Sequence, residues 1–379
     1  MRGPLRYILF GAHPFWSRVT LPRLESIGKA TCAAIVDADR ARLEMAASRL
    51  EVSWDRTFTD PLQALQECTA NFAVIATPGD QHEKYVDMCL TFDLHMLIEP
   101  PLADSMQSAA RIYRRVRDVG KRCVVASAAA MEQDKQTLLQ TLRTRDLGRL
   151  SQVSLRFAQN FRKVNSWGPH RHMMRQPLLI EAAMQHFELF RMAAGANART
   201  VFSQSWNTLW GEFKGDTSAL VTIEMENGVH CLYEGTVVAA ASTSPWGFEQ
   251  VRAECEGGSV DLDNRRLRVS VGEALDRPRY EDVPLIAGDT FGHPWVAEQF
   301  CDWCRKGPLP PTHLKDHIQT VAMTFAAIES AETGRPVKVQ EYLEQQLSAA
   351  KQEVRSERAA GAKAGISGAD QGLPGELPV

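Results

Sequence analysis

One segment of the chain, Trp167-Gly168-Pro169-His170-Arg171-His172, gathers residue types that are suited to acid–base chemistry. Histidine changes its protonation state near neutral pH, so His170 and His172 could exchange protons with a substrate or bind an anionic one. A metal site is not expected, because no third ligand accompanies the two histidines. A solvated surface loop is the alternative interpretation of the same residues.

A second segment, residues 11–16 (Gly-Ala-His-Pro-Phe-Trp), follows an apolar run at residues 7–10. Dinucleotide-binding proteins carry Gly-x-Gly-x-x-Gly at such a place, where the later glycines let the backbone approach the pyrophosphate and let the helix pack on the strand. Here only Gly11 is retained. His13 and Trp16 replace the others, so a dinucleotide would have to bind farther out or differently. The candidate contacts are Gly11, Ala12, His13, Phe15 and Trp16.

An acidic residue, Asp37, ends the second apolar run of the chain. An acid at this position can accept hydrogen bonds from an adenosine ribose and would repel a 2′-phosphate, which favours NAD over NADP. Alternatively, Asp37 caps the helix that follows it.

These residues need elements to position them, and the first third of the chain predicts a parallel sheet. Short apolar runs alternate with amphipathic stretches, which is typical of βαβ units. We expect this α/β domain to span residues 1–126. The predicted strands are Tyr7–Phe10, Cys32–Val36, Phe72–Ala76, His95–Ile98 and Arg122–Ala126, and the predicted helices are Ala41–Leu50, Lys84–Leu90 and Ser105–Val119, the last ending at a C-cap glycine, Gly120.

The pattern changes after residue 126 to long alternating stretches, which indicate antiparallel strands. Asn227-Gly228 between two of these stretches predicts a hairpin. We expect an α+β domain with a large, mostly antiparallel sheet over residues 127–346. Its predicted strands are 151–158, 219–225, 229–236, 251–256, 259–262 and 266–271, and its predicted helices are 178–194, 294–305 and 317–333.

The end of the chain, residues 347–379, is rich in Ala, Gly, Lys, Glu and Ser. It has few apolar residues to offset the entropy of ordering, so its composition predicts a flexible tail.

Composition narrows the classes of partner. A net charge of −3 over 379 residues disfavours nucleic acids and anionic membranes, and a small molecule fits better. No apolar run approaches the roughly 20 residues needed to cross a bilayer. The eight cysteines do not resemble the framework of a small secreted domain, so we expect free thiols in the cytoplasm.

Four motifs together resemble the glucose-fructose oxidoreductase, inositol dehydrogenase and MocA family, and the resemblance reaches to about residue 345. Two of them follow predicted strands, the third is a helix and the fourth closes the domain. They are Val74–Pro78 with His82, His95–Ala103, Pro177–Glu181 continuing to Gly195, and Thr324–Ala331 with Gly334–Val337.

The resemblance implies an N-terminal Rossmann domain, whose doubly wound parallel sheet binds a nicotinamide cofactor at the carboxyl ends of its strands. It also implies a second domain whose open sheet forms a homodimer or homotetramer. In the family, a lysine of a Glu-Lys-Pro motif positions the substrate hydroxyl, and a helix supplies an aspartate and, four residues later, the histidine that removes the proton. By this resemblance, further cofactor contacts are Ala76, Thr77, Pro78, His82, Glu99 and Pro100.

This sequence departs from the family pattern at the chemical groups. Glu99 is retained, but Pro100 stands where the lysine would be, and Glu181 and Gln185 replace the aspartate and the histidine. His186 is one residue further on, which rotates its side chain by about 100° around a regular helix. We therefore expect His186 to point elsewhere unless the helix is locally bulged.

Two functions follow from this pattern. The first is a divergent NAD-dependent oxidoreductase that acts on a sugar-like, polyhydroxylated small molecule, with His186, His170 or His172 as the base. The second is a pseudoenzyme, an accessory subunit or a protein that uses the same cleft for non-redox chemistry. The joint loss of two glycines, the lysine and the histidine is the reason to consider the second, because losing a general base typically costs about 10²- to 10⁴-fold in rate, and neither function is preferred strongly over the other.

Overall fold

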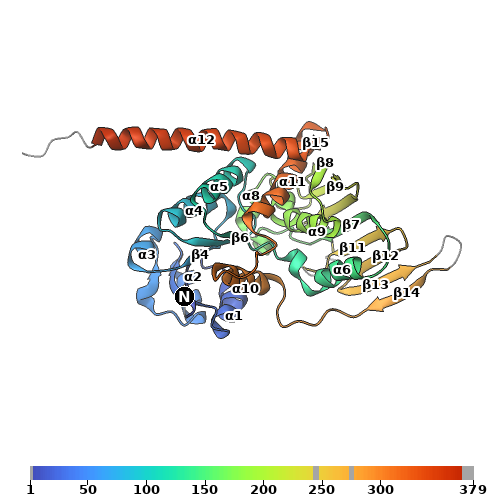
Figure 1. Cartoon of the computed structure of the whole chain (residues 1–379), viewed down its shortest axis with the longest axis horizontal. Coiled ribbons are helices and arrows are strands. Elements are labelled where there is room, and N and C mark those ends of the chain that lie inside the picture. The colour runs from blue at the N-terminus through green and yellow to red at the C-terminus, as the bar shows by residue number, and fades with distance from the viewer. Residues whose placement is uncertain (1–2, 242–246, 273–276, 369–379) are drawn as a thin grey trace, which may run out of the picture.

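Two sheets organise the chain, one in each of two α/β domains (Figure 1). The computed structural model describes residues 3–241, 247–272 and 277–368, with side chains up to residue 356. No helix in these ranges is long and apolar enough to cross a membrane. The predicted fold class is confirmed: a doubly wound parallel sheet precedes a domain with a large, mostly antiparallel sheet.

The first sheet has six parallel strands in the order β3-β2-β1-β4-β5-β6. The central strand β4 is buried along its whole length, as its unbroken apolar sequence requires, and β1 is buried at every residue except Arg6. The strands are β1 (Leu5–Phe10), β2 (Ala30–Val36), β3 (Thr57–Phe58), β4 (Phe72–Ile75), β5 (His95–Ile98) and β6 (Cys123–Val125). The helices are α1 (Leu21–Ser26), α2 (Arg40–Arg49), α3 (Pro61–Glu67), α4 (His82–Thr91) and α5 (Met106–Val119).

The predicted strands and helices of this domain are confirmed to within about two residues at most ends. Gly120 ends α5 with a φ of 75°, as a C-cap glycine does. The sequence analysis missed α1, α3 and the edge strand β3, which are short and carry weak periodicity.

Gly11 makes the turn after β1 possible. Its φ is +83°, and a Cβ at this position would lie 2.5 Å from the Ala76 carbonyl oxygen at the end of β4. We expect Gly11→Ala to lower the free energy of unfolding by about 2 kcal/mol or more, from left-handed strain and the forced separation of the two loops. Urea unfolding would measure it. Gly28→Ala, at a φ of +67° with open space around the Cβ, controls for strain alone.

The second sheet has nine strands in the order β14-β13-β12-β11-β7-β10-β9-β8-β15, and only β7 and β10 pair in parallel among its described pairs. The hairpin predicted at Asn227-Gly228 is confirmed, because it joins the antiparallel strands β9 and β10. The strands are β7 (Leu150–Ala158), β8 (Ala198–Trp206), β9 (Ser218–Met225), β10 (His230–Thr236), β11 (Gln250–Cys255), β12 (Gly258–Asp263), β13 (Arg266–Val271), β14 (Arg279–Val283) and β15 (Val337–Lys338).

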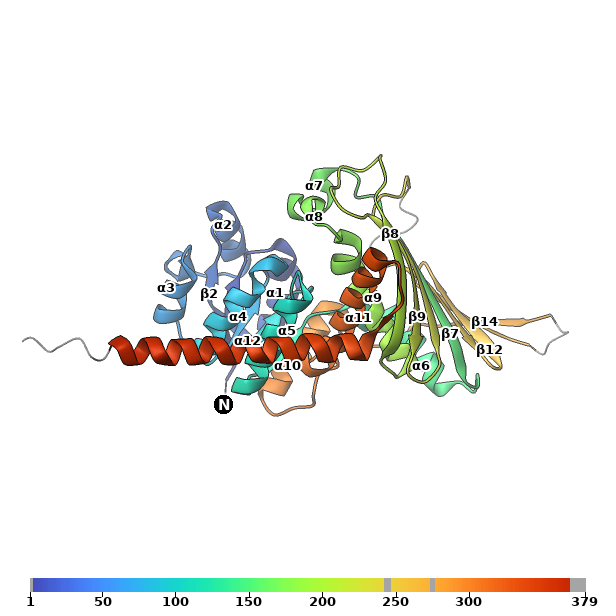
Figure 2. The ribbon, with the colours of Figure 1, turned by 90° about the horizontal axis from the view of Figure 1, so that it is seen from above.

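Helices cover the face of this sheet that is turned toward the first domain, and Figure 2 shows α9 and α11 between the sheet and that domain. The elements β8, β14, α6, α7 and α8 were not predicted, and α8 replaces the loop that was expected over residues 169–172. The helices of this part are α6 (Gln133–Thr144), α7 (Val164–Trp167), α8 (Pro169–Met173), α9 (Met184–Ala194), α10 (Gly292–Cys304) and α11 (Leu314–Thr333).

The last helix, α12 (Val339–Gly368), corrects the expectation of a flexible tail over residues 347–368. The expectation rested on composition, which hides a helical stripe: Leu343, Ala350 and Val354 are buried at a spacing of seven and four residues. Residues 369–379 lie outside the described residues. Figures 1 and 2 show α12 running from the edge of the second sheet along the first domain, where it packs on α5.

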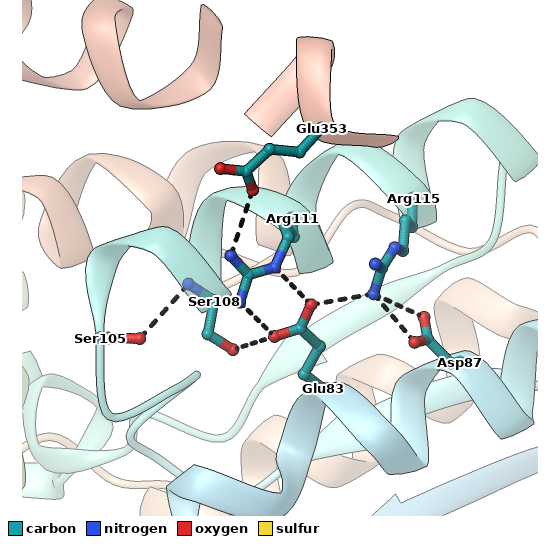
Figure 3. Close-up of polar contacts among 7 residues, drawn as sticks. All are labelled: Glu83, Asp87, Ser105, Ser108, Arg111, Arg115 and Glu353. Atoms are coloured by element: carbon teal, nitrogen blue, oxygen red, sulfur yellow. Dashed lines mark hydrogen bonds and ion pairs between the residues drawn. The ribbon is translucent and has the colours of Figure 1, made fainter. Parts of the chain in front are cut away.

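A polar network fastens α12 to the first domain (Figure 3). The Glu83 carboxylate of α4 accepts hydrogen bonds from Arg111 at 2.6 Å and from Arg115 at 2.9 Å, and Arg111 also donates to Glu353 of α12 at 3.2 Å. Partly exposed ion pairs of this kind add little stability individually, so we assign them mainly to orienting the helix.

Candidate active site

A pocket of about 390 Å³ lies at the carboxyl ends of β4 and β5, between the two domains. This is the edge at which open parallel sheets bind ligands. Four segments build it: the loop after β4, the loop after β5, the short helix α8 and the π-helical turn before α9. Its lining residues are Pro78, Gly79, Asp80, Gln81, Pro101, Asp104, His170, Met173, Met174 and Glu181.

The carboxylate of Glu181 is the buried acidic group of this pocket. Its residue is 8% exposed, and its Oε2 accepts a hydrogen bond from Nε of Arg171 at 2.6 Å. Burial raises the pKa of Glu181 and the Arg171 charge opposes this, with burial the larger effect. A carboxylate of raised pKa beside a cavity is a candidate proton acceptor.

Glu99 lies next to this group but does not line the pocket. The buried indole of Trp16 donates a hydrogen bond from Nε1 to Oε2 of Glu99 at 2.9 Å. Burial raises the pKa of Glu99 to about 7, while Trp16 and then Arg171 act to lower it and Glu181 acts to raise it. The site therefore holds two carboxyl groups whose pKa values burial raises.

The Trp16–Glu99 contact changes the interpretation of the segment after β1. The spacing of the sequence suggested that Trp16 would obstruct a nucleotide, whereas its side chain is fully buried beneath the loop. His13 and Phe15 are the exposed residues of the segment, and the Phe15 ring lies 4.7 Å from the ring of His293. The space outside Gly11 and Ala12 is therefore not filled by the indole.

Asp37 is held beside this loop and is not a helix cap. Its Oδ2 accepts the amide of Ala12 and its Oδ1 accepts the amide of Asp39, each at 2.8 Å. Asp39 is the residue that caps α2, through the amides of Ala41 and Arg42. Asp37 thus joins the end of β2 to the turn after β1, where an adenosine ribose binds in Rossmann sheets.

His82 connects the two pocket loops without reaching the pocket. It is fully buried, and its ring nitrogens lie 2.7 Å from the Thr77 carbonyl and 3.1 Å from the Leu102 carbonyl. Ala76 and Thr77 belong to the first of these loops, and the hydroxyl of Thr77 is buried without a hydrogen-bond partner among the described residues. We assign His82 to positioning the loops.

Three histidines were proposed as bases, and two of them, His172 and His186, lie away from the pocket. His172 is 1% exposed, stacks on Phe213 and faces the carbonyls of Gly168 and Phe161. The third, His170, does line the pocket, and burial, followed by the charge of Arg171, lowers its pKa to about 4. His170 is therefore a neutral hydrogen-bonding group at pH 7.

His186 also points away, although the helix is bulged as the alternative required. A π-helical turn, Leu178–Ala183, precedes α9, yet His186 is 2% exposed and contacts Tyr233 and Glu249 behind the helix. Gln185 is 9% exposed, and Pro100 offers no donor next to Glu99. We therefore no longer propose His186 or His172 as bases.

Sequence reasoning did not find the contacts that organise the site. Trp16 and Glu99 are 83 residues apart, and Arg171 and Glu181 lie on opposite sides of a turn. No local signal joins such pairs; only the abundance of polar groups in residues 167–172 pointed to this region. Within the described residues, no group of three or more His, Cys, Asp or Glu side chains is arranged to hold a metal ion.

Known proteins resemble this chain over most of its length. A model of an oxidoreductase family with an NAD-binding Rossmann fold, GFO_IDH_MocA, matches residues 5–127. Protein y4oX of Sinorhizobium fredii is 36% identical over 335 residues, covering 87% of this chain and 93% of its own. An inositol 2-dehydrogenase of Arthrobacter sp. is 30% identical over 356 residues, covering 89% and 97%.

Solved structures share the fold at low identity. An oxidoreductase from Agrobacterium radiobacter, in complex with NAD⁺, L-tartaric acid and magnesium, has a TM-score of 0.78 at 18% identity, covering 89% of this chain and 99% of its own. A levoglucosan dehydrogenase in complex with NADH and L-sorbose has a TM-score of 0.76 at 18% identity, with the same coverage.

Proposed function

Since the chain belongs to the glucose-fructose oxidoreductase, inositol dehydrogenase and MocA family of oxidoreductases, we propose that it oxidises a hydroxyl group of a sugar-like, polyhydroxylated small molecule with NAD. The observation that carries the proposal is the buried carboxylate of Glu181, which lines the pocket at the carboxyl ends of β4 and β5. The relatives' names support the class of substrate, not its identity.

The residues of the first domain fit a dinucleotide. Gly11 holds a left-handed turn against Ala76, and Asp37, fixed by two backbone amides, can still offer lone pairs to a ribose hydroxyl. The helical segment that begins at Pro14 turns its N-terminus toward this turn, where a pyrophosphate is favoured. Ala76, Thr77 and Pro78 would face the nicotinamide half. When bound, the nicotinamide accepts the hydride that leaves the substrate carbon.

Glu181 is the group of this chain that would take the proton. When a substrate alcohol is oxidised to a carbonyl, the hydrogen on the alcohol carbon leaves with its electron pair as hydride. The proton of the hydroxyl group passes to the Glu181 carboxylate. The proton need not go to Gln185, which has no basic group. The buried setting of Glu181 makes its carboxylate more basic than an exposed one, which suits this role.

Asp37 determines our preference for NAD over NADP. We expect Asp37→Ser to weaken NADH binding and to improve NADPH binding relative to NADH by about tenfold or more, because the carboxylate that repels a 2′-phosphate is removed. Arg42, whose Nη1 lies 3.8 Å from Asp37, would then be free to contact that phosphate. Fluorescence titration with both cofactors measures the ratio, and an unchanged ratio would refute the assignment.

The proposal as a whole is tested by cofactor binding and turnover. We expect NADH to quench tryptophan emission and to protect the protein thermally, and NAD to be reduced when myo-inositol or levoglucosan is offered as a probe polyol. Absence of binding by NADH and NADPH at about 1 mM would reject it.

Pro100 favours a second candidate, an inactive or non-redox relative. With proline in place of the lysine, position 100 offers no side-chain donor to a substrate hydroxyl. This candidate predicts cofactor binding without reduction of NAD for any polyol, so the same assays separate the two.

Assembly and compartment remain proposals. The outer face of the second sheet carries Leu220 and Leu232, 42% and 40% exposed, on neighbouring strands, which supports a homodimer or homotetramer through this face. All eight cysteines are free thiols, which supports a reducing cytoplasm. Light scattering of the purified protein tests the assembly.

A further inference from the structure

Arg171 places a positive charge beside the pocket from α8, whereas the family pattern has a lysine in the loop after β5. The loop after β5 has Pro100 instead of a lysine, while Arg171 of α8 donates from Nε to Glu181 at 2.6 Å. The Arg171 side chain is only 20% exposed, and its charge is near enough to lower the pKa of Glu99 as well. The charge of Arg171 therefore acts on the carboxyl groups of both Glu181 and Glu99.

We propose that Arg171 supplies the positive charge of the missing lysine and acts as a positioning residue that keeps Glu181 ionised and oriented toward the pocket. This inference rests on the proposed function, because it assigns the charge balance of the same site. According to this inference, the positive charge that the family has at position 100, in the loop after β5, is supplied by α8 instead.

Contacts with Trp167 and the packing of α8 hold the Arg171 side chain in one orientation. Its Nη1 donates to the Trp167 carbonyl at 3.0 Å, and its guanidinium lies 5.4 Å from the centre of the Trp167 ring. The next residue, His172, is buried and stacked on Phe213, so α8 cannot rotate without breaking that packing. Two contacts with Trp167 and the bond to Glu181 thus fix the direction of the Arg171 side chain.

Electrostatics explains why a cation is needed. A carboxylate that is 8% exposed loses most of its hydration and stays ionised near neutral pH only beside a compensating charge. Glu99 adds a nearby carboxyl, and Asp80 and Asp104 add two at the pocket lining. His170 is neutral at pH 7, so the positive charge that acts on Glu181 comes from Arg171.

If Arg171 replaces the family lysine, a lysine restored at position 100 should compensate for the loss of Arg171. Arg171→Met should raise the pKa of Glu181 by about 1 to 3, since an opposite charge within about 4–6 Å has an effect of that size. Adding Pro100→Lys to Arg171→Met should lower the pKa again, because the lysine returns at the family position. The probe is the Glu181 carboxyl signal, identified by its loss in Glu181→Gln and followed by ¹³C NMR of the full chain between pH 4 and pH 9.

Arg162→Met is the matched control. Arg162 is also a partly buried arginine over an indole, 5.9 Å from the Trp210 ring, and it bonds the Val238 carbonyl instead of a pocket carboxylate. It should leave the Glu181 signal unchanged. If Arg171→Met does not fold, Arg171→Lys, which keeps the charge, is compared with Arg171→Gln, which does not.

The outcomes separate this inference from the proposed function. A Glu181 pKa that is the same with and without Arg171, or that Pro100→Lys does not lower, overturns the inference even if NAD is reduced. A shifted and rescued pKa supports it, whether or not any polyol is turned over. Failure of NADH to bind the unaltered protein rejects the proposed function alone.

Discussion

Glu181→Gln should lower the rate of polyol oxidation by about 10²- to 10⁴-fold while NADH binds with little change. The amide keeps the size of the side chain and can still bond Arg171 through its oxygen, but it cannot accept the hydroxyl proton. The loss should appear in kcat and in kcat/KM alike, because the missing interaction forms during the chemical step. Steady-state kinetics with the best probe polyol, and fluorescence titration with NADH, measure the two parts.

Glu188→Gln is the matched control for this result. Glu188 lies on the same helix, is fully buried, and bonds His317, Thr320 and Arg191 away from the pocket. The substitution should cost stability without producing the selective loss of kcat. Turnover that survives Glu181→Gln at the original rate would show that another group takes the proton, and His170 would then be the next residue to replace.

The first domain was predictable because its signals are local. Apolar runs of four or five residues mark the strands, of which β4 is buried on both faces, and Gly120 marks the end of α5. Gly11 was predicted as the retained glycine of the turn after β1, and its φ of +83° and its approach to Ala76 give the physical reason.

The site was harder to predict because long-range contacts decide its chemistry. Spacing placed Trp16 at a glycine position, but only the fold reveals that its indole turns inward and finds Glu99. Periodicity predicted that His186 leaves the face of Gln185, and its contacts with Tyr233 and Glu249 agree, although a π-helical turn interrupts the predicted helix before it.

Burial also distinguishes residues that are equally good candidates from the sequence alone. His170 and His172 are two positions apart in the same segment, yet one lines the pocket and the other is enclosed by Phe213 and two carbonyls. The same limit affected α12, where composition suggested a tail and the burial of Ala350 and Val354 shows a packed helix. In each case the deciding contact comes from another element.

The two carboxyl groups of the site should respond differently to removal of their charge. Glu181 has a bonded cation, whereas Glu99 has an indole donor, which stabilises its anion less than an ion pair would. Burial accordingly leaves Glu99 with a pKa of about 7, against an ordinary value of 4.5. Its charge is therefore a cost to the folded state at neutral pH.

Glu99→Gln should consequently stabilise the protein increasingly as the pH rises from about 4.5 to about 7. The folded state of the unaltered protein binds this proton more tightly than the unfolded state, so its stability falls through that interval and the loss is complete above the folded pKa. The variant has no such loss and keeps the Trp16 bond through its amide oxygen. Partial exposure of Glu99 limits the difference to roughly 2–3 kcal/mol.

Urea unfolding of both proteins between pH 4 and pH 8 measures this difference directly. Glu44→Gln, on the exposed surface of α2, controls for the removal of one negative charge from the whole molecule. A constant difference between the Glu99→Gln variant and the unaltered protein across the interval would mean that Glu99 has the same pKa in the folded and the unfolded state. Trp16 would then stabilise the anion as effectively as a cation does, and the balance of charge argued for Arg171 would involve one carboxylate more.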